Sequence, residues 1–202
     1  MILDHLVVGG TDRDAARAHV EDALGVSMQP GGQHPVFHTH NALMALEDGI
    51  YLEAIAPNPA APKPARPRWF DLDRFEGPPR LSNWVCAVPD MEAVLPQMPE
   101  GSGTPVDLQR GDLTWRMAVS SDGTTPFDCL FPAVIQWTAG VHPAKTLTQT
   151  GVRLRRLTLV HPDGDALAMA IGHHLEDDRI AVEVGPNALH AAFETPNGER
   201  HL

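Results

Sequence analysis

Cysteine is scarce in this sequence. Only two cysteines occur among 202 residues, Cys86 and Cys129, and each lies within an apolar run. Two cysteines are too few for a framework of disulfide bonds or for a zinc site built from thiolates. We therefore interpret both as small buried residues of the core.

Basic residues are also few, and long hydrophobic runs are missing. The chain has 15 lysines and arginines against 26 acidic residues, a formal charge of −11. Proteins that bind the backbone of nucleic acids carry the opposite excess, so we expect no nucleic-acid partner. The N-terminus lacks a basic segment, and no run approaches the roughly 18 apolar residues of a transmembrane helix. We therefore expect no membrane association and predict a cytoplasmic protein.

Several catalytic signatures are missing as well. No glycine-rich phosphate loop precedes a helix, and no His-Glu-x-x-His zinc motif occurs. Ser120 and Ser121 lie beside Asp122 and Gly123, a composition typical of a turn rather than of a nucleophile elbow.

Internal repetition and many turn-forming residues are what the sequence does contain. Its 17 glycines and 19 prolines favour short elements over long helices. At three places a strand-like apolar run is followed, seven residues after its first residue, by an aspartate: His5 and Asp12, Asn83 and Asp90, and Arg156 and Asp163. Such an aspartate can cap a helix by accepting hydrogen bonds from the first backbone N–H groups. We predict a strand and then a short helix at each place.

Pairs of strand-like stretches follow each predicted helix. The expected pairs are residues 41–46 with 50–55, 113–119 with 127–131, and 180–184 with 188–193, each flanking a turn that contains glycine. The sequence therefore predicts an α+β fold made of repeated βαβββ modules, at residues 1–56, 80–137 and 153–202. We expect residues 1–143 to hold two paired modules. Residues 144–202 should form a third, shortened βαβββ-like segment packed on the same domain.

A proline-rich segment separates the first two modules. Residues 57–67 contain five prolines, which cannot donate to a sheet and favour an extended chain. We interpret this segment as an exposed linker, with a proline-recognition motif as the alternative. The aromatic stretch after it, residues 68–72, is expected to pack back onto the core.

Five short stretches of the chain form a recognisable set. They are LDHLVVGG (3–10), HTHNALMAL (38–46), YLEAIAPNP (51–59), LSNWVCAV (81–88) and CLFPAVIQW (129–137), the last followed by His142 and Pro143. Together they resemble the glyoxalase-like domain family of the vicinal oxygen chelate superfamily. The resemblance implies that paired modules form a cupped, mostly antiparallel sheet with helices outside, which holds a small ligand or a metal ion in its concavity. Modules in this superfamily pair within one chain or across a dimer, so a homodimer is a further expectation.

The resemblance also implies a set of site residues. The four positions that bind metal in metal-using members correspond to His5, Glu53, Asn83 and Gln136. The first two keep a histidine and a glutamate, whereas the other two are amides, which bind metals weakly. His38 and His40 are candidates to complete a metal site, since alternation puts both on one strand face. The cofactor expected is thus a divalent metal (Zn, Ni, Mn or Fe) held by His5 and Glu53, or none.

Glu53 is the strongest of these candidates on chemical grounds. Tyr51, Glu53 and Ile55 share one face of a strand, and a carboxylate among apolar neighbours needs a partner. That partner is His5, Arg116 or a ligand. We expect Glu53 and His5 to be catalytic, and we expect ligand contacts from a second group: His40, Asn41, Tyr51, Asn83 and Gln136. The alternative for His5 is a structural histidine that is hydrogen-bonded to a neighbouring strand.

Two functions remain open at this point, beside a pure interaction scaffold that no feature of the sequence supports. One is an enzyme of lyase or isomerase type that acts on a small oxygenated molecule, with Glu53 as base or ligand and His5 as ligand or proton relay. Ring cleavage with iron would need two clear histidines and a carboxylate. The other is a metal-free protein that binds and sequesters a small molecule.

Overall fold

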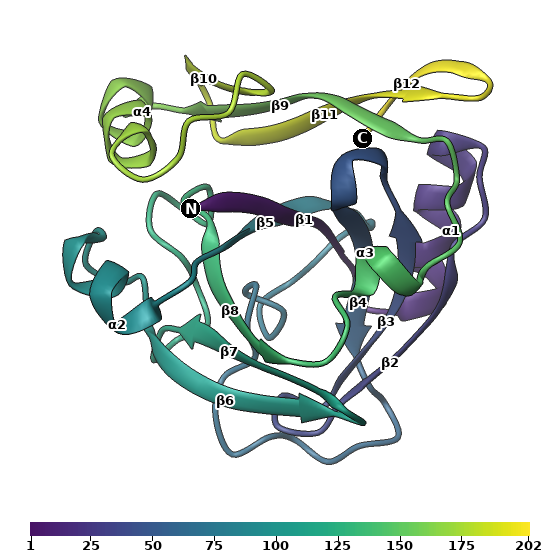
Figure 1. The fold of residues 1–202 in the computed structure, drawn as a ribbon, viewed down its shortest axis with the longest axis horizontal. Helices are drawn as coiled ribbons and strands as arrows, with labels where there is room; N and C mark the ends of the chain where they lie inside the picture. Colours follow the sequence, from purple (N-terminus) through teal and green to yellow (C-terminus); the bar gives the residue numbers. More distant parts are fainter.

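Three successive βαβββ segments make up the chain (Figure 1). The computed structural model describes residues 1–202, of which 41% are in strands and 17% in helices. The first segment comprises β1 (Ile2–Gly9), α1 (Arg13–Leu24), β2 (Gln29–His34), β3 (Thr39–Ala45), a short η1 (Glu47–Gly49) and β4 (Tyr51–Pro57). The second comprises β5 (Arg80–Ala87), α2 (Met91–Val94), η2 (Leu95–Gln97), β6 (Thr104–Arg110), β7 (Leu113–Val119) and β8 (Ala133–Ala139). After α3 (Pro143–Thr146), the third comprises β9 (Arg153–His161), α4 (Gly164–Gly172), β10 (Ile180–Val184), β11 (Ala188–Thr195) and β12 (Gly198–His201).

The first two segments form one eight-stranded sheet, in the order β2-β3-β4-β1-β5-β8-β7-β6. In each segment the first strand pairs in parallel with the last, β1 with β4 and β5 with β8. The antiparallel pair β1 and β5 joins the two halves, so both modules of the sheet come from one chain. The sheet curls into a half-barrel (Figure 1) whose edge strands approach each other. The predicted cupped fold is confirmed.

The third segment forms a separate four-stranded sheet in the order β10-β9-β11-β12. Here β9 pairs in parallel with β10 and antiparallel with β11. The expected hairpin between residues 180–184 and 188–193 is therefore wrong, because these strands flank β9 on opposite sides. The crossover through α4 returns the chain beside β9, and residues 185–187 then carry it past β9 to its other edge. This segment keeps the order of elements but not the strand order of the first two.

Two of the three predicted aspartate caps form. The Asp12 carboxylate accepts from the backbone N–H of Ala15 at 2.8 Å, and Asp90 accepts from Ala93 at 3.1 Å. Asp163 precedes α4 but its side chain makes no capping bond. A left-handed Gly25 ends α1, as expected of glycine at a helix C-terminus.

The expected strand at residues 127–131 is absent, and the strand that pairs with β7 is β8, Ala133–Ala139. Phe127, Asp128 and Cys129 have φ values of 55°, 51° and 72°, which a strand cannot contain. These three residues form a turn instead, and the strand begins after Pro132.

The connection between β4 and β5 contains no helix or strand. Its prolines lie mostly at the surface, although Pro64 is buried. The aromatic stretch that follows packs back as expected, because Trp69, Phe70 and Leu72 join a core of 13 buried residues on the concave face of the sheet.

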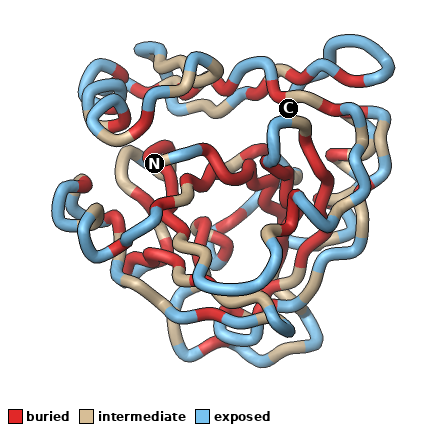
Figure 2. Tube along the Cα trace, viewed as in Figure 1, coloured by how far each residue is buried: buried red, intermediate tan, exposed pale blue.

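A second core of 32 buried residues lies on the convex face. It joins Leu6 and Trp84 of the central strands to α1, β9, β11 and α4, so the four-stranded sheet covers the back of the half-barrel (Figures 1 and 2). Figure 2 shows the buried residues concentrated along the central strands. The concave face is therefore not covered by the four-stranded sheet, and a cavity can form there. None of the helices is long and apolar enough to cross a lipid bilayer.

Candidate functional site

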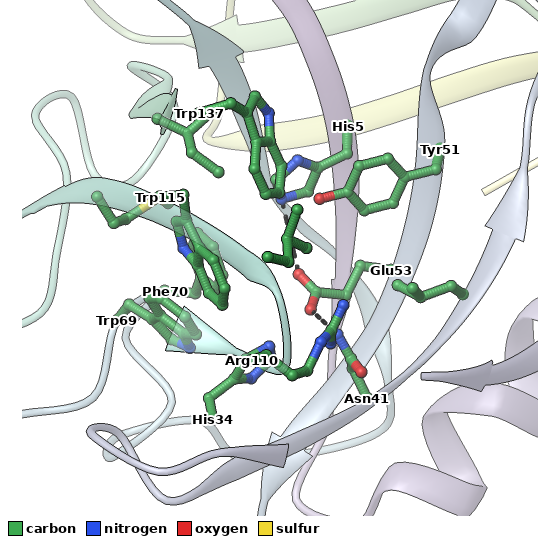
Figure 3. A pocket seen from close by; sticks show the side chains of 14 residues that line it. His5, His34, Asn41, Tyr51, Glu53, Trp69, Phe70, Arg110, Trp115 and Trp137 are labelled. Atoms are coloured by element: carbon green, nitrogen blue, oxygen red, sulfur yellow. Dashed lines mark hydrogen bonds and ion pairs between the residues drawn. The ribbon is translucent and has the colours of Figure 1, made fainter. Parts of the chain in front are cut away.

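The candidate site is a narrow cavity inside the curl of the eight-stranded sheet (Figure 3). Its wall is made by 14 residues: His5, His34, Asn41, Leu43, Tyr51, Glu53, Trp69, Phe70, Arg110, Leu113, Trp115, Met117, Ile135 and Trp137. They come from β1, β2, β3, β4, β6, β7, β8 and the segment after the prolines. The free space is about 30 Å³, which is room for about two water molecules.

Strand pairing brings His5 and Glu53 into this cavity. In the parallel register of β1 and β4, His5 is opposite Tyr51 and Val7 is opposite Glu53. Both site residues are almost fully buried, and Nε2 of His5 lies 3.7 Å from Oε2 of Glu53. The ring of Tyr51 stacks on His5 with centroids 4.4 Å apart. The structure thus holds these two side chains together, while their catalytic roles stay a prediction.

Asp4 holds the other side of the His5 ring. Oδ1 of Asp4 lies 2.6 Å from Nδ1 of His5, and Oδ2 accepts from Nε1 of Trp137 at 2.7 Å and lies 3.1 Å from Nε2 of His142. Burial alone would raise the pKa of the Asp4 carboxyl. The hydrogen bonds from His142, His5 and Trp137 outweigh burial and hold this pKa well below its usual range. Asp4 is therefore a carboxylate at neutral pH, and it orients His5.

Sequence reasoning missed Asp4 because adjacent residues of a regular strand point to opposite faces. Leu3 pairs with Cys86 and His5 with Val85, so Asp4 is an extra residue in a β-bulge. The bulge lets Asp4 and His5 turn toward each other. The Asp-His pair in LDHLVVGG was the available signal, but only the strand pairing reveals its geometry.

Glu53 has a second partner that depends on two glycines. Its Oε1 accepts from Nδ2 of Asn41 at 2.5 Å, and Oδ1 of Asn41 accepts from the backbone N–H of Gly32 at 2.7 Å. A Cβ on Gly31 would lie 2.0 Å from Oδ1 of Asn41, so a side chain there would displace the amide. The Gly31-Gly32 pair belongs to β2 and gives the backbone its close approach to Asn41.

Aromatic side chains form most of the remaining wall. Trp115 and Trp137 lie with ring centroids 5.7 Å apart, and Trp69 stacks with Phe70 at 5.4 Å. His34 meets Trp69 edge to face at 5.0 Å, and burial lowers the pKa of His34 to about 3. His34 is thus a neutral imidazole. The wall offers mostly flat apolar surface to a ligand.

Arg110 is a charged residue of the wall that sequence reasoning did not identify. It ends β6 and lies against Gly32 of β2, where a Cβ would come within 2.6 Å of its Cδ. Its Nη1 is buried and has no hydrogen-bond partner. No local motif singles out this arginine, because its position depends on the curl that brings β6 to β2.

Three predicted ligand-contacting residues lie elsewhere. Gln136 faces away from the cavity between Ile135 and Trp137, where its amide bonds to the carbonyl of Pro89 at 3.0 Å and to the N–H of Met91 at 3.2 Å. Gln136 therefore lies outside this cavity, because alternation along β8 puts it on the opposite face.

The strand register shows which residue of the second module corresponds to Glu53 of the first. Val7, two residues after His5, is opposite Glu53, and Val85, two residues after Asn83, is opposite Ala133. Alanine therefore occupies the position in the second module that glutamate occupies in the first.

Asn83 and His40 are the other two. Asn83 is buried, with neither amide atom hydrogen-bonded, but it lines a separate cavity that shares only Phe70 with the site. His40 lines a third cavity beside Arg13 and Arg17, and burial lowers its pKa. Asn41 and Tyr51 do line the site.

Arg116, which was considered as a partner of Glu53, binds Glu92 and Asp107 at the surface instead. His38 does not line the site either, since its ring bonds to the carbonyl of Pro62 at 2.5 Å. Neither residue can complete the polar cluster around Glu53.

The residues present do not make up a resident metal site. A catalytic zinc ion takes three protein ligands at about 2.0–2.2 Å plus an open position. His5 and Glu53 supply two donors, and the structure contains no group of three or more His, Cys, Asp or Glu side chains that could share an ion. One oxygen of Glu53 is already held by Asn41, and Ala133 stands where a second carboxylate would be needed.

Comparison with known proteins identifies the family. The sequence pattern of the glyoxalase-like domain matches residues 3–175. A crystal structure of a hypothetical protein from Staphylococcus aureus has the same fold, with a TM-score of 0.59 at 13% sequence identity over 100% of this chain and 84% of that one. No protein of curated function matches the sequence. The chain therefore belongs to the glyoxalase-like domain family, of the vicinal oxygen chelate type.

Proposed function

We propose that this protein binds a small oxygenated molecule in the cavity and transforms it by proton transfer, with chemistry of isomerase or lyase type. The observation that carries the proposal is the row Asp4, His5, Glu53, with 2.6 Å between the first two side chains and 3.7 Å between the last two. An ionised Asp4 accepts the proton of Nδ1, which leaves the lone pair of Nε2 facing the cavity. That arrangement suits a general base.

The step follows from this geometry. A C–H bond next to a carbonyl group breaks, its electron pair stays on the substrate as an enolate, and the proton moves to Nε2 of His5. The two carboxylates that flank the ring stabilise the imidazolium that forms. Return of the proton at another atom gives an isomerisation, and loss of a leaving group from the enolate gives an elimination. Asp4 acts as a positioning residue, and Asn41 fixes Glu53 so that Oε2 faces Nε2.

The cavity's apolar walls support proton transfer in a second way. Nine of its 14 wall residues are hydrophobic, so few waters compete for the base. Both modules of the cup belong to one chain, and we propose a small molecule as the partner of this site. A homodimer stays a prediction that the site does not require.

Proton exchange in D₂O tests the proposal without knowledge of the natural substrate. Small aldehydes, ketones and 2-oxo acids would be incubated with the protein, and NMR would follow loss of the C–H signal next to the carbonyl. We expect accelerated exchange of at least one compound, reduced by about 10²-fold or more in His5→Gln and Glu53→Gln. His201→Gln and Glu183→Gln change exposed residues outside the cavity and should leave the rate unchanged. Exchange no faster than in buffer, or an unaffected rate in a His5→Gln protein with native circular dichroism, would contradict the proposal.

A second candidate is sequestration of a ligand without chemistry. The observation in its favour is the aromatic wall of Trp69, Phe70, Trp115 and Trp137, which suits tight binding as well as catalysis. A compound that quenches tryptophan fluorescence on binding but shows no exchange, with equal affinity for His5→Gln, would support this function instead.

A further inference from the structure

Arg110 is the charged group of the cavity whose hydrogen bonding is left incomplete. Its Nη1 is buried without a partner, and the guanidinium forms no ion pair with any carboxylate of the protein. Arg153 and Arg179, by contrast, pair with Asp48 and Asp177 at 2.7 Å. A buried guanidinium donor without an acceptor is costly, so this position calls for an acceptor that the protein does not supply.

Glu53 of the cavity and Asp4 behind His5 do not serve as that acceptor. Asp4 is bound by three side chains, and Glu53 is bound by Asn41 and faces His5. Each of these carboxylates thus has at least one hydrogen-bond donor from the protein, whereas Nη1 of Arg110 has no acceptor. His34 does not supply a competing positive charge, since burial keeps it neutral.

The position of Arg110 is built into the fold. β6 and β2 are the edges of the half-barrel, and the absence of a side chain at Gly32 leaves the space that the Arg110 side chain fills. Figure 3 shows Arg110 on the side of the cavity that also carries His34 and Asn41, away from Trp137. A ligand bound between these groups would have one end at Arg110 and the other toward His5.

We propose that the ligand of this cavity is a small carboxylate and that Arg110 is the residue that selects it. A guanidinium donates two parallel hydrogen bonds to the two oxygens of a carboxylate, a match that a neutral amide or ketone does not offer. The narrowness of the cavity, with about 30 Å³ of free space, favours a small ligand. The inference rests on the proposed function, because the carboxylate would anchor the molecule with its neighbouring carbon toward His5.

A small organic cation is the competing ligand, because aromatic walls also bind ammonium groups. The positive charge of Arg110 opposes that ligand, and the nearby carboxylates are already hydrogen-bonded. The two ligand classes therefore predict opposite results for probes of similar size.

Binding would be measured with acetate, acetamide and tetramethylammonium, by quenching of the tryptophans that line the cavity and by ligand-observed NMR. We expect acetate to bind at least tenfold more tightly than acetamide or tetramethylammonium. Arg110→Gln should weaken acetate binding tenfold or more, and Arg110→Lys severalfold, because lysine keeps the charge but not the two-pronged geometry. The exposed Arg200→Gln is the matched control.

Equal binding of acetate and acetamide, preferred binding of tetramethylammonium, or full acetate affinity in Arg110→Gln would overturn the inference. If Arg110→Gln does not fold, Arg110→Lys alone decides, since undiminished acetate binding there would exclude two-pronged recognition.

The proton-exchange experiment separates the two proposals. If neutral ketones exchange their protons in a way that needs His5 but not Arg110, the proposal of a carboxylate ligand is refuted and the proposal of proton transfer stands. If acetate binding depends on Arg110 but no compound exchanges its protons, the proposal of proton transfer is refuted and the proposal of a carboxylate ligand is supported.

Discussion

Replacing Asp4 by asparagine tests the arrangement around His5 most directly. The substitution keeps shape and volume but removes the charge that accepts hydrogen bonds from Trp137 and His142. Hydrogen bonds to charged groups contribute about 1.5–3 kcal/mol and neutral ones about 0.5–1.5 kcal/mol. Losing about 1 kcal/mol at each of the two bonds lowers the free energy of unfolding by about 2 kcal/mol at neutral pH. The amide would also donate to Nδ1 of His5, which moves the imidazole proton to Nε2 and removes the base, so proton exchange should fall by about 10²-fold or more.

The pH dependence gives an independent check on the same variant. The pKa of Asp4 is lower in the folded than in the unfolded state, where it is about 3.9. The unfolded state therefore binds more protons in acid, and the stabilisation by Asp4 is complete above the unfolded pKa and is lost as the pH falls below it. Urea unfolding followed by tryptophan fluorescence should show the difference between wild type and Asp4→Asn shrinking from pH 7 toward pH 3. The exposed Asp178→Asn is the control. A loss below about 0.5 kcal/mol at pH 7 would refute the reasoning, since it is less than one neutral hydrogen bond contributes. A difference that grows in acid would refute it as well.

Two further predictions concern residues and ligands that the sequence had assigned to the site. Gln136→Ala should lower the free energy of unfolding by about 0.5–1.5 kcal/mol, because it removes the side-chain hydrogen bonds to Pro89 and Met91. The rate of proton exchange should stay at the wild-type value. A variant that folds but loses exchange would show that Gln136 does take part in the site. Untagged, dialysed protein should contain well under one equivalent of Zn, Ni, Mn or Fe per chain, and EDTA should leave its melting temperature unchanged, because His5 and Glu53 are two donors only. One tightly held equivalent that Glu53→Gln abolishes would contradict the donor count.

The sequence predicts the parts of this fold that depend on local spacing. Asp12 and Asp90 cap their helices as the spacing of seven residues indicates, because a cap involves only neighbouring backbone groups. The turn at Glu47–Gly49 joins β3 and β4 as an antiparallel pair for the same reason. Alternation along β4 put Tyr51 and Glu53 on one face, and a buried carboxylate there needed a partner. The fold class and the burial of Glu53 beside a partner were accessible in this way, and the family through the resemblance of short motifs.

The rest of the site was decided by how the strands pair, which spacing alone does not reveal. The bulge at Asp4 lets two adjacent side chains bond to each other, and the register that puts Ala133 opposite Val85 leaves Gln136 on the other face of β8. A bulge, or a shift by an odd number of residues, changes which side chains share a face of a strand. Arg110 reaches the cavity only because curvature accumulated over eight strands brings β6 to β2, distant in sequence and at opposite edges of the sheet. Residue types are written in the sequence, but which of them share a cavity depends on register and curvature, which arise only when the whole sheet forms.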